Sequence, residues 1–121
     1  MNPLLLRTAA KWKIPRELAL LVIARDRRCI YCSREFGEPQ APRAARPSWE
    51  HIVNDESIVN LSNIALCCVG CNASKGTKPL SHWLKTNYCS ERSITSQSIS
   101  EVALSSLNME TSSQEGSQLN S

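Results

Sequence analysis

Two matched cysteine pairs constrain the fold of this chain more than any other feature. Cys29 and Cys32 form one Cys-x-x-Cys unit, Cys68 and Cys71 form a second, and 35 residues separate the two units. Tetrahedral zinc binds four thiolates at about 2.3 Å, and each Cys-x-x-Cys turn can present two of them to one ion. We therefore expect a structural zinc site that clips two distant segments together.

Two further cysteines need a separate interpretation. Cys67 immediately precedes Cys68, so a pair with three intervening residues, Cys67 and Cys71, is an alternative; Cys68 and Cys71 repeat the spacing of the first unit. A free cysteine packs as a small hydrophobic residue, and we interpret Cys67 and Cys89 in this way. A thioredoxin-like redox role would need one such unit in a βαβ context, which the sequence does not indicate.

The size of the chain makes a staple of this kind necessary. At 121 residues it is one small domain, which needs a metal, disulfides or a partner for stability. The N-terminal "MNPLLL" does not match a signal peptide, and the longest apolar run, residues 18–24, is far shorter than a membrane span. We expect a cytoplasmic protein with reduced thiols and no membrane partner.

Charge is unevenly distributed along the chain. Residues 1–90 carry 13 Lys and Arg against 7 Asp and Glu, whereas residues 91–121 carry 1 against 4. A basic body with an acidic end suits a polyanionic partner such as nucleic acid. An ordinary solvated surface can show the same excess, so charge alone does not separate the two interpretations.

Local patterns predict helices on either side of a pair of short strands. Apolar spacing predicts a helix at about residues 15–27, with Pro15 in its first position. "SWEHIV" and "IALCC" are typical of short strands, joined by the turn-rich "NDESIVNLSN". From Asn72, expected as a helix cap, we predict a short helix, a break at Gly76 and Pro79, and another turn.

The two least apolar stretches are expected to be irregular. "GEPQAPRAARP" predicts an exposed loop, and the Ser- and Gln-rich C-terminal end cannot bury enough apolar surface to become ordered. Between them, "SITSQSISEVALSSL" predicts a last amphipathic helix, capped by Ser98 or by Thr95. The chain therefore divides into an N-terminal extension (1–14), a core domain (15–90), a C-terminal helix (91–107) and a disordered tail (108–121).

Closing the cysteine clip should gather a set of polar residues. Glu50 and His51 lie in the first predicted strand, Asn63 precedes the second, and Asn72 follows Cys71 directly. Carboxylate and amide oxygens suit Mg²⁺ or Mn²⁺ better than a second zinc. A histidine beside a hydrated ion can take a proton from water.

This ordered set, "CIYC … SWEHIV … NIALCCVGCNASKG", resembles an HNH endonuclease over residues 12 to about 90. The family pattern is an acidic residue with His, then Asn five positions before a Cys-x-x-Cys, then Asn or His directly after it, then Lys-Gly. The resemblance implies a small α+β protein with a ββα-metal (HNH or His-Me finger) core. A structural four-cysteine zinc site would staple that core, with helices at its N- and C-terminal sides.

The resemblance also implies an activity and a role for each site residue. The protein would be a divalent-metal-dependent endonuclease that hydrolyses DNA to 5′-phosphate and 3′-hydroxyl ends, in the cytoplasm of a bacterial or phage-like context. His51 would be the general base that activates water, and Asn63 would orient the active-site loop through backbone hydrogen bonds. Glu50 and Asn72 would hold a catalytic Mg²⁺ or Mn²⁺ ion.

Two departures from the family pattern bear on the expected ion. The family often has Asp where this chain has Glu50, and the longer side chain could shift the ion. It also often has His where this chain has Asn72, which favours Mg²⁺ or Mn²⁺. Moreover, adjacent side chains of a regular strand point to opposite faces, so Glu50 and His51 can serve one site only where the strand ends, twists or bulges.

Basic residues near the motifs are candidates for contacts to DNA phosphates. No separate specificity segment is evident, so we expect low specificity, a homodimer or a targeting partner protein. The alternatives to a nuclease are a non-catalytic zinc-knuckle module that binds nucleic acid, and a degenerate nuclease. The candidate phosphate contacts are Lys75, Lys78, Arg27 and Arg28, with Arg25 beside them.

Overall fold

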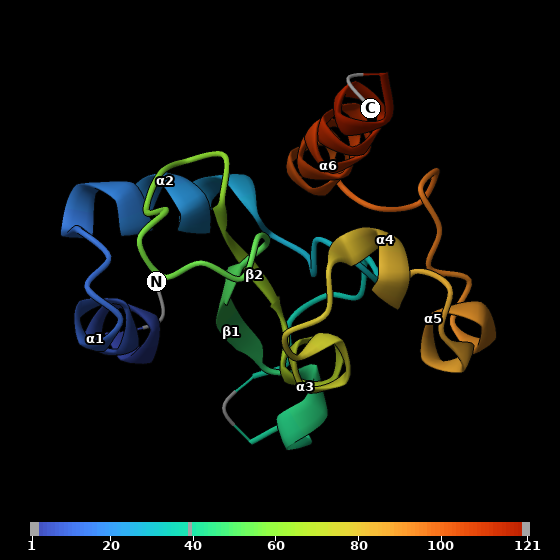
Figure 1. Cartoon of the computed structure of the whole chain (residues 1–121). Coiled ribbons are helices and arrows are strands. Elements are labelled where there is room, and N and C mark those ends of the chain that lie inside the picture. Colours follow the sequence, from blue (N-terminus) through green and yellow to red (C-terminus); the bar gives the residue numbers. More distant parts are fainter. Residues whose placement is uncertain (1–2, 39, 120–121) are drawn as a thin grey trace.

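The computed structural model describes residues 3–38 and 40–119, which form a two-stranded sheet surrounded by helices (Figure 1). Among these residues, none of the helices combines the length and apolarity needed to cross a bilayer. The elements in chain order are α1 (Pro3–Lys11), α2 (Arg16–Arg25), the 3₁₀ turn η1 (Arg43–Ala45), β1 (Pro47–His51), β2 (Ile64–Cys68), α3 (Val69–Lys75), α4 (Leu80–Trp83), α5 (Asn87–Glu91) and α6 (Glu101–Leu119).

The centre of the fold is an antiparallel hairpin that both halves of the chain cover. β1 pairs with β2 so that Trp49 faces Leu66 and His51 faces Ile64. Every residue of β2 is buried. Side chains alternate between the faces of a strand, so Leu66 packs with α1 and α2, whereas Ala65 and Cys67 pack with the cysteine clip and the C-terminal helices. Both predicted strands are thereby confirmed.

Helix α1 is part of the core, although we expected residues 1–14 to be only an extension. Leu5 and Ala9 are buried in the cluster that contains Trp49. The Trp49 indole Nε1 donates to the Leu5 carbonyl at 2.9 Å, so a strand side chain bonds directly to the helix backbone. At nine residues, α1 is too short to be stably helical by itself in water, so its helicity depends on this tertiary packing.

Helix α2 confirms the predicted helix, with slightly narrower bounds and Pro15 just outside it as the N-cap. Its C-cap residue, Asp26, is buried, and its Oδ2 accepts from the Leu66 backbone N–H at 3.0 Å. Arg25 pairs with Asp26 at 2.7 Å and donates to the Leu61 and Ile64 carbonyls. Arg25 is therefore committed to joining α2 to β2, and this corrects its expected role as a phosphate contact.

Helix α3 ends at a break, as the sequence indicated. Gly76 follows it with φ 54°, a left-handed conformation in which glycine has no Cβ penalty. α4 then starts after Pro79. The expected cap was wrong by one turn: Cys68 is the N-cap, and Asn72 lies inside α3.

Helix α6 differs most from expectation. It begins at Glu101 and continues to Leu119, so the segment expected as a disordered tail is helical up to that residue. Residues 120 and 121 lie outside the described part of the chain. Ser98 does not cap α6; its Oγ accepts from the Thr95 N–H at 2.8 Å in the turn before the helix. Buried Ala103 and Leu107 pack α6 onto the larger core cluster.

We predict that Asp26→Ala destabilises the domain. The change leaves the guanidinium of Arg25 and the N–H of Leu66 without their carboxylate, and breaking a buried pair of this kind costs about 3 kcal/mol. Urea unfolding followed by circular dichroism measures the loss. The control is Glu17→Ala, which removes an exposed carboxylate in the first turn of the same helix. Equal midpoints for the two variants would contradict the assignment.

Candidate metal centre and active site

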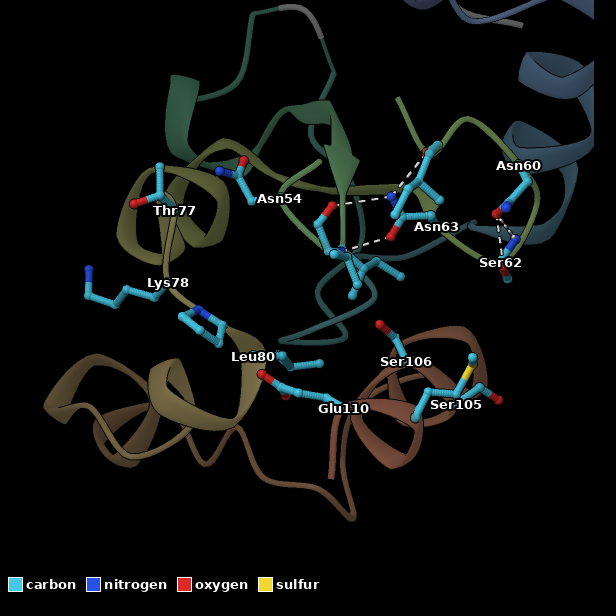
Figure 2. A pocket seen from close by; sticks show the side chains of 15 residues that line it. Asn54, Asn60, Ser62, Asn63, Thr77, Lys78, Leu80, Ser105, Ser106 and Glu110 are labelled. Carbon is cyan, nitrogen blue, oxygen red and sulfur yellow. Dashed lines mark hydrogen bonds between the residues drawn. The ribbon is translucent and has the colours of Figure 1, made fainter. Parts of the chain in front are cut away.

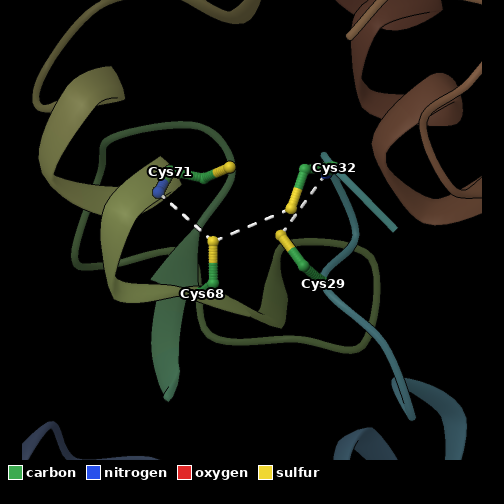
Figure 3. A group of neighbouring side chains, drawn as sticks. All are labelled: Cys29, Cys32, Cys68 and Cys71. Atoms are coloured by element: carbon green, nitrogen blue, oxygen red, sulfur yellow. Dashed lines mark hydrogen bonds between the residues drawn. The ribbon is translucent and has the colours of Figure 1, made fainter. Parts of the chain in front are cut away.

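The four cysteines of the two Cys-x-x-Cys units meet at one point (Figure 3). Their sulfur atoms all lie within 4.8 Å of one another, and the Sγ atoms of Cys32 and Cys68 are 3.8 Å apart. Four converging sulfurs suit the tetrahedral geometry that zinc adopts in structural sites. This cluster could therefore hold a metal ion such as zinc, in agreement with the sequence.

Backbone groups shape both cysteine turns. The N–H groups of Tyr31 and Cys32 point at the Cys29 sulfur at 3.4 and 3.5 Å, and the Cys71 N–H points at the Cys68 sulfur at 3.4 Å. Such donors stabilise thiolates and fix their direction. The phenol of Tyr88 adds a contact of 3.5 Å to the Cys71 sulfur.

The electrostatics of the cluster also favour a cation. Hydrogen bonds with neighbouring sulfurs, Cys32 first and then Cys68, raise the pKa of the Cys29 thiol, and the hydrogen bond with Cys29 lowers the pKa of the Cys32 thiol to about 6. Neighbouring sulfurs likewise raise the pKa of Cys71. Four thiolates can coexist here when a divalent ion offsets their charge.

Cys67 and Cys89 lie outside this cluster. Both are buried, and the Cys67 sulfur lies 3.9 Å from the Ser48 hydroxyl. Burial raises the pKa of each thiol, as expected for a sulfur that packs as a small apolar group. The choice of Cys68 over Cys67 as the fourth member of the cluster is confirmed.

Asn63 organises the loop between the two strands (Figure 2). Its Oδ1 accepts from the Val53 N–H at 2.8 Å, and its Nδ2 donates to the Val53 and Ile58 carbonyls. The Asn63 carbonyl also accepts from the Ile52 N–H at 3.0 Å. The buried amide thus fastens the chain directly after His51, as expected from the sequence.

Glu50 is buried on the side of β1 that α3 covers. Its Oε2 accepts from the Tyr31 hydroxyl at 2.7 Å and lies 3.3 Å from the Lys75 ammonium. Burial raises the pKa of the Glu50 carboxyl, and Lys75 and Tyr31 oppose that shift. The carboxylate proposed as a metal ligand therefore already has a cationic partner and a hydroxyl donor.

Lys75 is an interior residue and does not reach the surface. It is 1% exposed, and its Nζ donates to the Ile52 carbonyl at 2.9 Å. This corrects its expected role as a DNA contact, because a buried ammonium with two protein partners cannot bind a phosphate. Lys75 instead contacts the chain on both sides of His51, through the Glu50 side chain and the Ile52 carbonyl. Sequence reasoning missed this link; the signal was its spacing of three from Asn72 on the same face of α3.

His51 occupies the last position of β1 and is half-buried. Its Nε2 is buried and has no hydrogen-bond partner among the described residues. Adjacent strand positions face opposite ways, so His51 does not share the face on which Glu50 meets Lys75. A buried nitrogen of this kind needs a partner that the protein itself does not supply.

Asn72 faces β1 from the first half of α3. Its Nδ2 donates to the Ser48 hydroxyl and to the Trp49 carbonyl, both at 3.0 Å. A carbonyl only accepts, so the atom facing it must be the nitrogen. The Asn72 Oδ1, the atom that could bind a cation, makes no hydrogen bond to another described residue.

The other predicted phosphate contacts are on the surface. Arg27 is exposed, and Arg28 is exposed while paired with Glu35 at 3.0 Å. Lys78 is exposed at the edge of a cavity of about 710 Å³ that lies between the Asn63 loop and α6 (Figure 2). His51 and Glu50 do not line this cavity.

A second cavity, of about 510 Å³, lies between α1 and β1. Ser48, Trp49 and Asn72 form part of its wall. This cavity reaches Asn72, whereas the larger one reaches Asn63.

Comparison with protein families, with curated proteins and with solved structures finds no match to this chain.

We predict that Cys68→Ser abolishes zinc binding and unfolds the domain, because three sulfurs cannot complete the site and the clip opens. Cys67→Ser should retain one zinc per chain, since its sulfur lies outside the cluster. Elemental analysis of purified protein, together with circular dichroism, measures both effects. Loss of zinc in the Cys67 variant would show that the cluster has a different fourth ligand.

We predict that Lys75→Met costs about 3–5 kcal/mol of unfolding free energy, because Glu50 is left as an unpaired buried carboxylate. Adding Glu50→Gln removes that charge and should recover a large part of the loss. Lys78→Met, an exposed lysine three positions away, is the matched control and should change stability by less than about 0.5 kcal/mol. Additive losses in the double variant would argue against a coupled pair.

Proposed function

We propose that this protein is an endonuclease of the HNH type that hydrolyses phosphodiester bonds in DNA. The order of elements supports the proposal: an antiparallel hairpin, β1 and β2, leads directly into α3, and the cysteine cluster sits where β2 meets α3. The polar residues that the resemblance assigns to catalysis lie on these three elements or on the loop between the strands.

The observation that carries the proposal is the unpaired Nε2 of His51. Leaving a buried nitrogen without a partner costs about 1–3 kcal/mol, so this atom needs a physical explanation. Asn63 and Lys75 hold the backbone directly after this histidine. An imidazole whose buried Nε2 has no hydrogen-bond partner is suited to accept a proton from water.

The family resemblance implies the following reaction for this arrangement. His51 takes a proton from a water molecule, the water oxygen bonds to phosphorus, and the bond from phosphorus to the 3′-oxygen breaks. The released oxygen takes a proton from solvent, which leaves 5′-phosphate and 3′-hydroxyl ends. Arg27, Arg28 and Lys78 are the surface candidates for contacts with neighbouring phosphates.

The structural zinc and the catalytic divalent ion that the resemblance implies do not fit the residues of this chain equally well. The cysteine cluster fits structural zinc in the number and chemistry of its ligands. Glu50 and Asn72 fit a divalent ion less well, because Lys75 and Tyr31 already contact the Oε2 atom of the carboxylate. Dependence on Mg²⁺ or Mn²⁺ remains a prediction for the cleavage assay to test.

The contact between Glu50 and Lys75 favours a second candidate, a zinc-stapled module that binds nucleic acid without cutting it. If Glu50 serves only as the partner of Lys75, the chain lacks its anionic metal ligand. The basic body and the cysteine cluster would then serve binding alone.

A plasmid assay separates the two candidates. We predict that the zinc-loaded protein nicks supercoiled plasmid in the presence of Mg²⁺ or Mn²⁺, and that His51→Ala lowers the rate at least 100-fold, in line with loss of a general base. Agarose gels read out the nicked and linear products. His82→Ala is the matched control, because His82 is the other histidine and is exposed on α4.

Zinc content and thermal unfolding should be the same for the two histidine variants. Wild-type protein that cuts no faster than His51→Ala in either metal would remove the enzyme proposal. Chelators are unsuitable as a metal-free control, since they also extract the structural ion.

A further inference from the structure

We propose that the cavity between α1 and β1 binds one unpaired nucleotide of a single DNA strand. The proposal deepens the proposed function by assigning a substrate subsite, and it places that subsite on the segment expected to be a mere extension. It rests on the charge, the exposed ring and the position of the cavity.

The charge of the cavity suits a phosphate. Arg7 from α1 and Arg46 from the segment before β1 both line it, and none of its lining residues is acidic. The Arg46 Nε donates to the Ala41 carbonyl at 3.0 Å, which fixes the direction of its guanidinium. Residues 1–16 carry only basic charges, so the field around α1 attracts polyanions.

The exposed ring suits a base. Trp12 lines the cavity and is 51% exposed, although it is among the largest apolar side chains of the protein. Trp49 and Trp83 are buried, so Trp12 is the one indole with a free face among the described residues. Bases of single strands stack on such rings, with a contribution of about 1–3 kcal/mol each.

The position links the cavity to the candidate active site. Asn72 and Ser48 form part of the wall, and Asn72 has the unpaired Oδ1 described above. The bond from Trp49 to Leu5 ties the α1 backbone, which carries Arg7, to the strand that Asn72 contacts.

Anisotropy of a fluorescein-labelled 12-nucleotide oligo(dT), without added Mg²⁺ or Mn²⁺, tests the subsite. Trp12→Ala and Arg7→Gln should each weaken binding about tenfold, and Arg7→Gln should also lower the salt slope by about 0.7. Trp12→Phe retains a ring and should recover most of the affinity. Lys85→Gln removes an exposed charge between α4 and α5, on the opposite side of the sheet, and should change affinity less than twofold (Figure 1).

The same titration with a 12-base-pair duplex completes the test, and duplex binding should depend little on Trp12. Wild-type affinity in both Trp12→Ala and Arg7→Gln would overturn the subsite, as would an equal loss in Lys85→Gln. Failure of the subsite and failure of the nuclease are distinguishable. If the protein binds a single strand through Trp12 but does not nick plasmid, the subsite is supported and the nuclease proposal is not. If nicking requires His51 but strand binding does not require Trp12, the nuclease is supported and the subsite is not.

Discussion

Convergence of four sulfurs is the constraint on which the rest of this structure depends. It ties the loop after α2 to the junction of β2 and α3, segments 35 residues apart in the chain. A two-stranded hairpin is marginal by itself in water. With the clip closed, α2 covers one face of the hairpin and α3 the other, and β2 becomes fully buried. The short α3 then starts at a fixed point, because Cys68 caps it and Cys71 lies in its first turn.

A second constraint is the set of side-chain contacts between α3 and β1, two elements that the cysteine clip holds together. α3 runs along β1, so that Asn72 meets Ser48 and Trp49 and Lys75 meets Glu50 and Ile52. One helix of seven residues thereby contacts positions 48–50 and 52, on both sides of His51. The buried charge of Lys75 is tolerated because Glu50 offsets it and a carbonyl accepts its hydrogen bond.

The sequence predicted the features that depend on motifs with fixed spacing, but it did not predict which side chains pack against one another. The cysteine cluster, both strands and the break at Gly76 follow from local chemistry at set intervals, whereas the backbone hydrogen bonds of Asn63 were expected from the family resemblance. The partners of Lys75 and Arg25 were missed, because a basic residue in sequence looks the same whether it faces solvent or a buried carboxylate. α1 was missed for a related reason: its nine residues are too few to be helical alone, and Trp49 supplies the missing contacts.

Glu50 has two competing roles: it is the buried partner of Lys75 and the proposed ligand of a divalent ion. A carboxylate in a dry site needs a cation, and an ammonium or a divalent ion can satisfy that need. Lys75 already does so at 3.3 Å, with the Tyr31 hydroxyl completing the shell. Both partners contact Oε2, so an ion that bound this oxygen would have to displace the ammonium, whereas Asn72 offers its oxygen without such a cost. If the protein cuts DNA as proposed, the strength of this ion pair would govern how readily Glu50 binds an ion.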